Sequence, residues 1–420
     1  MESTSVAPSE TPNARSRLLD AAVEQIARLG VARVSARSVA EAAGMVASSI
    51  NYNFGTIERM YCAAFAQGST LAEAWISLRK DELAQLPKSR QSASLALEYV
   101  VGAWTQGTRP LALLYQECAS DRPGRGPAVL WTKLWRNFWI DAALQLGMGE
   151  DEGRLMHLFF ESEALHHLCS WSPVLETAAL REMCNHFCAT WLGARPVPPT
   201  GALAQAQRLS GVRFAGSLGA AAMKIAEAAA AVVEQRGLDG LTHRAVAARA
   251  AVTTGAVAHH FRTVEDLVAG AIRGQVQVAS KSDDTGENAA PAPPMTKAQL
   301  FAATRAAVMT EDLGGPALGR RHLFMAAIRR PGMANAAAVS RFSYGATTEG
   351  ALVANFDIPE DLRALYAATF ARLLSSIWIA STADPDPRAA RERAYVEVVS
   401  RLLQSFGEDE TARRSLVEQR

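Results

Sequence analysis

Residues 243–263 read HRAVAARAAVTTGAVAHHFRT, and residues 36–56 read ARSVAEAAGMVASSINYNFGT. The two stretches are offset by 207 residues, and the alignment runs without a gap over Arg17–Phe65 and Lys224–Ile272. Identical residues at that offset include Val39/Val246, Ala40/Ala247, Ala43/Ala250, Phe54/Phe261 and Thr56/Thr263. Chance rarely keeps register over such a length, so the chain contains one unit twice.

The repeated segment predicts short helices with recognisable ends. In the first copy, apolar residues recur at helical spacing over 18–29, and Gly30 ends this helix because glycine tolerates a positive φ. Ser35 is the expected N-cap of a second helix, Ala36–Ala43, which breaks at Gly44.

A third helix is expected over Ala47–Phe54, and a fourth begins at Thr56 or, in the second copy, at Thr263. Asp266 lies three residues after Thr263 and completes a capping-box pattern. Two short helices that are joined by a tight turn and packed on a longer first helix form a helix-turn-helix, whose second helix can enter the major groove of DNA.

The third helix of each copy begins with small and polar side chains, as a helix must if its backbone is to approach base edges closely. The expected DNA-binding residues are Arg37, Ser48, Ser49, Asn51, Tyr52, Asn53 and Thr56 in the first copy, and Arg244, Thr253, Thr254, Gly255, His259, His260, Arg262 and Thr263 in the second. Phosphate contacts are expected from Arg37, Arg244 and Arg262, with Arg15 and Arg17 as a flexible arm.

Composition and charge agree with a globular DNA-binding protein. The 420 residues are 49% hydrophobic and 20% charged, which excludes a disordered chain and predicts two to four domains. Lys and Arg total 43 against 42 acidic residues, so attraction to DNA must come from local patches. Basic residues exceed acidic ones by two in 15–66 and again in 213–274.

Both segments resemble the N-terminal DNA-binding domain of the TetR family of transcriptional repressors. The resemblance rests on VAARAAVTTGAV at 246–257 with HHF at 259–261, and on VAEAAGM at 39–45 with YNF at 52–54. Family members usually carry Lys where this chain has Ile57 and Val264, and the turn glycine Gly44 is replaced by Ala251 in the second copy. The resemblance implies an all-α fold of two tandem units, each a three-helix DNA-binding domain followed by a helical effector and dimerisation domain.

What the resemblance implies for function is a ligand-responsive regulator, a repressor in the usual case. It would bind double-stranded operator DNA and be released by a small effector. Because the third helices of the two copies differ, we expect the operator to be imperfectly palindromic. Because both helix-turn-helix motifs belong to one chain, we expect an intramolecular pseudodimer; whether pseudodimers pair further into homodimers stays open.

The repeat and its breaks divide the chain into eight segments. We expect a disordered arm at 1–14, DNA-binding domain 1 at 15–66, helical effector and dimerisation domain 1 at 67–195, a linker without regular structure at 196–217, DNA-binding domain 2 at 218–274, a flexible loop at 275–297, helical effector and dimerisation domain 2 at 298–407 and a tail at 408–420.

Five cysteines without a disulfide framework, and an N-terminus without an apolar core, favour a cytoplasmic protein with no membrane partner. Seven of the eight tryptophans lie in the first copy, which suggests an aromatic-lined pocket for a hydrophobic effector there. The expected effector-binding residues are Trp104, Tyr115, Trp131, Trp135 and Phe138, with Arg136 or His166 available for an acidic group. The same aromatic side chains could instead fill a core.

Other interpretations stay open at this point. A metal or redox site could be formed by Cys169, Cys184, His186 and Cys188, with His157, His166 and His167, although the sequence contains no CxxC pair and no HExxH motif. A regulator with only one active helix-turn-helix is a further alternative. We expect no enzyme activity and no cofactor, because no phosphate-binding glycine loop, serine elbow or catalytic carboxylate pair is recognisable.

Overall fold

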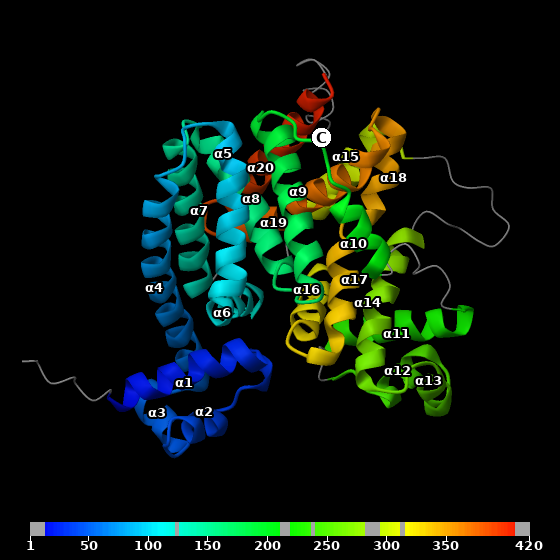
Figure 1. Cartoon of the computed structure of the whole chain (residues 1–420). Helices are drawn as coiled ribbons and strands as arrows, with labels where there is room; N and C mark the ends of the chain where they lie inside the picture. The colour runs from blue at the N-terminus through cyan, green and yellow to red at the C-terminus, as the bar shows by residue number, and fades with distance from the viewer. Residues whose placement is uncertain are drawn as a thin grey trace, which may run out of the picture. The chain divides into compact units, whose positions relative to one another are not determined.

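The computed structural model describes residues 13–121, 126–210, 219–236, 240–281, 295–310 and 316–407. Within these ranges every regular element is a helix (Figure 1), which confirms the predicted all-α class. The chain divides into two compact units. Unit 1 comprises Met1–Trp75 and Pro110–Trp131, and unit 2 comprises Ile76–Arg109 and Thr132–Arg420.

Unit 1 contains the first DNA-binding segment and the helix that supports it. Its elements are α1 (Ala14–Leu29), η1 (Val31–Arg33), α2 (Ala36–Ala42), α3 (Ser48–Phe54), the first part of α4 (Ile57–Leu83), α6 (Arg109–Asp121) and the start of α7 (Pro127–Gln145). The Trp131 indole N–H donates to the Phe65 carbonyl at 3.0 Å, and the Glu117 carboxylate accepts from the Val31 backbone N–H at 3.0 Å. Both contacts hold the DNA-binding helices to the supporting helices of the same unit.

Unit 2 contains the rest of the first copy and the whole described part of the second. Its first-copy elements, besides the ends of α4 and α7, are α5 (Arg90–Gly102), the π-helical turn η2 (Ala103–Gly107), α8 (Glu150–His166) and α9 (Pro173–Leu192). Its remaining elements are α10 (Ala202–Ser210), α11 (Ala220–Arg236), α12 (His243–Ala250), α13 (Thr254–His260), α14 (Val264–Lys281), α15 (Lys297–Val308), α16 (Pro316–Ala327), η4 (Pro331–Met333), α17 (Ala334–Phe342), α18 (Ala346–Asn355), η5 (Glu360–Leu362), α19 (Arg363–Ser381) and α20 (Pro387–Ser405).

Helices of the two copies pack together in the core of unit 2. Helix α19 packs on α8 and α9, and α20 packs on α9 and α19. The Trp191 indole N–H of α9 donates to the Val398 carbonyl of α20 at 3.1 Å. Phe187 of α9 and Leu373 of α19 are both fully buried.

Helices occupy parts of three segments that were expected to lack regular structure. Helix α1 begins at Ala14, and the Asn13 side chain caps it by accepting from the Ser16 N–H at 2.8 Å. Helix α14 continues to Lys281, and Thr296 caps α15, so both helices enter the segment expected as a flexible loop. The linker contains a helix, α10, whose first backbone N–H groups donate to the Glu182 carboxylate. Residues 1–12, 211–218, 282–294 and 408–420 of these segments lie outside the described residues.

One helical segment in the described part of the chain, Glu360–Ser381, is long and apolar enough to cross a membrane by length and composition. Its most apolar window is 72% buried, as expected of the core helix of a soluble protein.

Candidate nucleic-acid interface

Local capping interactions hold the first helix-turn-helix in shape. The Ser38 N–H donates to Ser35 Oγ at 3.1 Å, and the Ser35 N–H donates to Ser38 Oγ at 3.0 Å, so α2 begins with a reciprocal capping box. Ile50 and Phe54 are buried and fasten α3 to the unit from its inner face. The opposite face of α3 is therefore presented to solvent.

The second helix-turn-helix is built in the same way from different residues. The Thr253 hydroxyl accepts from the Ala256 N–H at 3.1 Å and caps α13. The predicted capping box at α14 is confirmed, because Asp266 accepts from the Thr263 N–H and Thr263 accepts from the Asp266 N–H, both at 3.0 Å. The His243 ring donates to the Phe261 carbonyl at 2.7 Å and joins α12 to the end of α13.

The turn between the two motif helices has the same backbone shape in both copies. The Met45 N–H donates to the Ala40 carbonyl at 2.8 Å, and the Val252 N–H donates to the Ala247 carbonyl at 3.0 Å. Gly44 adopts a φ of +69°, and its counterpart Ala251 adopts a φ of 51°. The second copy thus retains the turn with a left-handed alanine, which costs about 1–2 kcal/mol because its Cβ crowds the following carbonyl oxygen.

Replacing Ala251 with glycine should therefore stabilise unit 2 by about 0.5–1 kcal/mol, once the greater freedom of glycine in the unfolded chain is counted. Urea unfolding monitored by circular dichroism would measure the change. The control is Ala248→Gly, at an exposed position inside α12, which should lose about 1 kcal/mol. A loss of stability in both variants would contradict the strain at Ala251.

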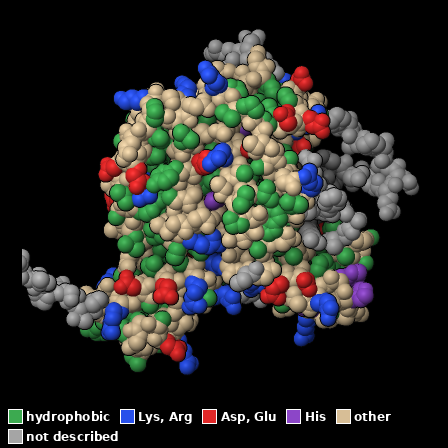
Figure 2. Space-filling model, viewed as in Figure 1, with side chains coloured by type: hydrophobic (Ala, Val, Ile, Leu, Met, Phe, Trp, Pro, Cys, Tyr) green, Lys and Arg blue, Asp and Glu red, His purple; other side chains and the backbone are tan. Residues whose placement is uncertain are grey.

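Most of the predicted DNA-binding residues lie on exposed surface. The Tyr52 side chain is 92% exposed. The other exposed residues are Arg37, Ser48, Asn51, Thr56, Arg244, Thr253, Thr254, Gly255, His259, His260, Arg262 and Thr263. Histidine side chains gather over α13, with Lys and Arg side chains on the surface near them (Figure 2). Such a surface can donate hydrogen bonds to phosphate oxygens and to base edges.

Four residues have a different environment from the one expected. Ser49 and Asn53 are half-buried, and the Asn53 amide donates to the Ser49 carbonyl at 2.8 Å. Arg15 and Arg17 lie in α1, not in a flexible arm. The Arg15 guanidinium donates to the Asn53 carbonyl at 2.9 Å and lies 4.6 Å from the centre of the Phe54 ring. The side chains of Arg15 and Asn53 thus make contacts within the DNA-binding domain that stabilise α3.

The aromatic residues expected to bind the effector form two sets of ring contacts. Tyr115 and Trp131 stack in unit 1, with ring centroids 5.1 Å apart. Trp135 lies in unit 2, where its ring centroid is 4.9 Å from that of Trp104 and 5.7 Å from that of Phe138. All five aromatic side chains are fully buried.

The two polar candidates have partners in the second copy. Arg136 forms an ion pair with Asp384 at 2.9 Å. The His166 ring donates to the Ser162 carbonyl at 2.7 Å, and its centroid is 4.6 Å from that of Tyr344. Both residues thus contact helices or turns of the second copy, which sequence patterns of the first copy alone could not reveal.

Two buried polar atoms on α7 and α8 have no hydrogen-bond partner among the described residues. They are Trp139 Nε1 on α7 and His157 Nε2 on α8. The Trp139 ring contacts Phe160 at a centroid distance of 5.3 Å. Burial, with a smaller contribution from the Arg136 charge, lowers the pKa of His157 to about 3, so its ring is neutral. Neither atom could be predicted from the sequence, because an unsatisfied polar atom has no sequence pattern.

The cysteines lack the environment of metal or redox sites. Burial raises the pKa of the Cys169, Cys184 and Cys188 thiols, whereas metal ligation requires the thiolate. Within the described ranges, no three His, Cys, Asp or Glu side chains are grouped closely enough to hold a metal ion. The geometry therefore gives no support to the metal-sensing alternative.

Comparison with known proteins locates the same two segments. Residues 18–64 and 225–271 each match the family model described as "Bacterial regulatory proteins, tetR family". A solved structure of a transcriptional regulator from Streptomyces coelicolor A3(2) is also similar, with 25% sequence identity, 40% of this chain and 96% of that chain covered, and a TM-score of 0.29. No curated protein matches the chain in this comparison.

Proposed function

Because the chain is a tandem TetR-family transcriptional regulator with two helix-turn-helix domains, we propose that it binds one imperfectly palindromic operator as an intramolecular pseudodimer. TetR-family regulators are non-enzymatic DNA-binding proteins, in agreement with the absence of a catalytic motif in the sequence. The observation that carries the proposal is the pair of exposed third helices with different chemistry. Helix α3 presents Asn51 and Tyr52, whereas α13 presents His259 and His260.

The packing of α8 and α9 on α19 and α20 supports pairing within one chain. We propose that 67–195 and 298–407 act as the effector and pairing domains and that 196–217 joins the two copies. A dimer normally reads two half-sites about 34 Å apart, one turn of DNA. The protein would act in the cytoplasm, where operator DNA is accessible, and we propose repression as its mode of regulation.

The proposal is tested with the DNA upstream of the protein's own coding region, by gel shift at fixed salt, because phosphate contacts make affinity salt-dependent. Light scattering on the same complex should give one 45.0 kDa chain per operator. Swapping the bases of each half-site independently should cause unequal losses of affinity, because the two helices differ. Equal losses would overturn the asymmetric operator.

Alanine at Tyr52 and at His259 should each weaken operator binding by about tenfold or more, because a well-placed base contact contributes about 1–3 kcal/mol. Each variant should respond to base changes in a different half-site, as measured by fluorescence anisotropy. Gln85→Ala, at an exposed position beyond α4, is the matched control. If one of the two alanine variants binds like the unaltered protein, the alternative with a single active helix-turn-helix is favoured.

We further propose that a small hydrophobic or aromatic effector acts on the buried aromatic side chains of the first copy. The support is the Trp104, Trp135 and Phe138 cluster, with the unsatisfied Nε1 of Trp139, whose ring centroid lies 4.9 Å from that of Phe138, as a hydrogen-bonding group. Tyr115 and Trp131 in unit 1, and Arg136 and His166 in unit 2, stay candidates. The effector would bind more tightly to a conformation in which the recognition helices are misplaced for DNA. It would then lower DNA affinity by at most the ratio of its affinities for the two conformations.

Any compound that releases the protein from DNA should change its intrinsic tryptophan fluorescence. Trp135→Phe retains an aromatic ring and should reduce that change without abolishing release. A compound that releases DNA and leaves the fluorescence of the unaltered protein unchanged would count against an effector site at these aromatic residues.

A further inference from the structure

Most ion pairs between the two copies in the described part of unit 2 have the same sense. Carboxylates of the first copy contact arginines of the second. These pairs are Glu152–Arg401 at 3.2 Å, Glu161–Arg321 at 4.0 Å, Glu163–Arg341 at 3.1 Å, Glu163–Arg372 at 2.9 Å and Glu176–Arg341 at 3.5 Å. A pair of opposite sense joins Arg136 to Asp384 in a partly exposed position. The interface is thus acidic on one side and basic on the other.

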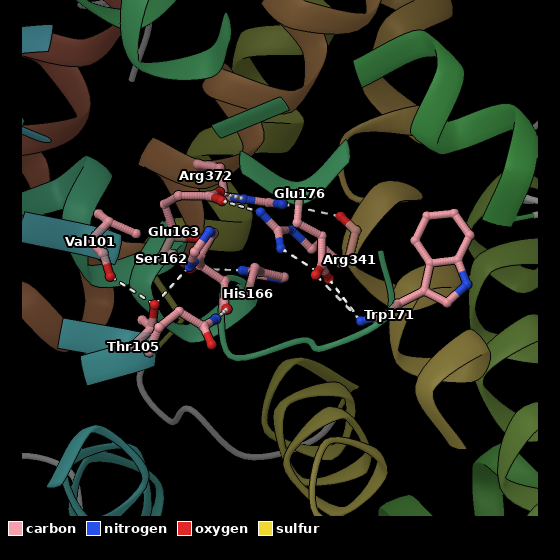
Figure 3. Close-up of polar contacts among 11 residues, drawn as sticks. Val101, Thr105, Ser162, Glu163, His166, Trp171, Glu176, Arg341 and Arg372 are labelled. Atoms are coloured by element: carbon pink, nitrogen blue, oxygen red, sulfur yellow. Dashed lines mark hydrogen bonds and ion pairs between the residues drawn. The ribbon is translucent and has the colours of Figure 1, made fainter. Parts of the chain in front are cut away.

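Glu163 is the centre of this arrangement (Figure 3). Its side chain is 0% exposed, and those of Arg341 and Arg372 are 1% and 2% exposed. One carboxylate oxygen accepts from Arg341 Nη2 at 3.1 Å and the other from Arg372 Nε at 2.9 Å. Arg372 Nη2 also donates to the Arg341 carbonyl at 3.0 Å, so the two arginines are held together and both donate to Glu163.

Buried charges of this kind are tolerated only with opposite partners, because removing an ion from water is costly and a single unpaired ion recovers none of that cost. The pairing of the halves must therefore bring Glu163 to the two arginines. A pairing that fails to do so leaves a carboxylate or two guanidinium groups buried without a counter-ion.

Pairing between identical copies fails in this way. Helices α8 and α19 meet where Ser162 Oγ lies 3.1 Å from Ser375 Oγ, at a separation of 213 residues in the chain. At the repeat's offset of 207, Arg372 corresponds to Leu165 and Glu163 corresponds to Phe370. Two first copies would therefore place Glu163 opposite Leu165, and two second copies would place Arg372 opposite Phe370. Neither residue can neutralise the buried charge.

We propose that Glu163, together with Arg341 and Arg372, determines which helical domains pair, so that a first copy pairs only with a second copy. The proposal rests on the pseudodimer proposed above and adds its specificity. This specificity prevents the first copies of two chains, or their second copies, from pairing with each other. Such a pair would place two identical recognition helices on one operator.

The test is a charge-reversal cycle in the full-length protein. Glu163→Arg and Arg372→Glu should each lower the melting temperature by about 10 °C or prevent folding. The double variant should recover at least half of that loss, because the reversed side chains face one another and Arg341 keeps Glu176 at 3.5 Å. Single variants that melt like the unaltered protein, or a double variant no better than the sum of the singles, would overturn the proposal.

A second measurement separates pairing from general stability. A protease site is inserted between Ser210 and Gly219, the full-length protein is cut, and the fragments are examined by native mass spectrometry. The unaltered protein and the double variant should give complexes of one fragment of each kind, whereas those single variants that fold should give separate fragments. Same-kind pairs from the unaltered protein would also overturn the proposal.

The control pair is Arg305–Glu392, which joins α15 and α20 within the second copy through two hydrogen bonds of 2.9 Å. Its single reversals should leave the fragments of the cut protein together. Operator binding is measured in parallel by anisotropy. Paired fragments without DNA binding would contradict the proposed function alone, and same-kind pairs with DNA binding would contradict the pairing rule alone.

Discussion

Acidification from pH 7 to pH 5 is expected to lower the free energy of unfolding by about 4 kcal/mol through two buried histidines, His157 and His186. Burial lowers the pKa of each ring to about 3 in the folded protein. The unfolded chain binds a proton at each ring near pH 6.5, whereas the folded protein does not. Each histidine therefore contributes stability that is present above pH 6.5 and is lost as the pH falls toward 3, about 2 kcal/mol of it by pH 5.

Burial also lowers the pKa of His166 and His167, so these two rings act in the same direction. Urea titrations at pH 7 and pH 5, followed by circular dichroism, measure the loss. His186→Gln should reduce the pH-dependent loss by about 2 kcal/mol. His259→Gln is the control, because that ring is exposed. Equal stability of the unaltered protein at the two pH values would show that these rings are not buried in neutral form.

Replacing Trp135 with alanine is expected to destabilise unit 2 by about 4 kcal/mol, the usual cost of emptying a large aromatic site in a core. The Trp135 side chain is fully buried. Its ring centroid lies 4.2 Å from that of Phe160 and 4.9 Å from that of Trp104, so truncation removes many close contacts at once.

Chemical unfolding of Trp135→Ala, compared with Trp75→Ala at a half-buried position on α4, measures the effect. The Trp75 variant should lose less than half as much, because less surface is removed from contact. A small loss at Trp135 would mean that the site already contains space, and it would favour an effector pocket over a filled core.

The sequence predicted the DNA-binding segments almost to the residue. Helix α2 spans Ala36–Ala42 against the expected 36–43, and α3 spans Ser48–Phe54 against the expected 47–54. Both helices are bounded by caps and turn residues only a few positions away, so the information is local. Ala251 is an exception to the rule that glycine occupies positions of positive φ, because this alanine keeps the left-handed turn.

The expectations that depended on distant contacts were less successful. The linker was expected to lack regular structure because of its prolines and glycines, yet α10 forms where Glu182 of α9 caps its start. The expected effector site included Arg136 and His166 as free polar groups, but both have partners in the second copy. Packing between helices of the two copies, which no local pattern encodes, provides these partners.

The sequence by itself determined the repeat, the all-α class and the two DNA-reading helices, because helical periodicity, caps and tight turns depend on residues within a few positions of one another. Only the tertiary structure decided which charges meet. Glu163 lies 178 residues from Arg341 and 209 residues from Arg372, yet its carboxylate contacts both. Packing of the two copies removes the Glu163 carboxylate from water, and this burial is costly unless the two arginines neutralise its charge.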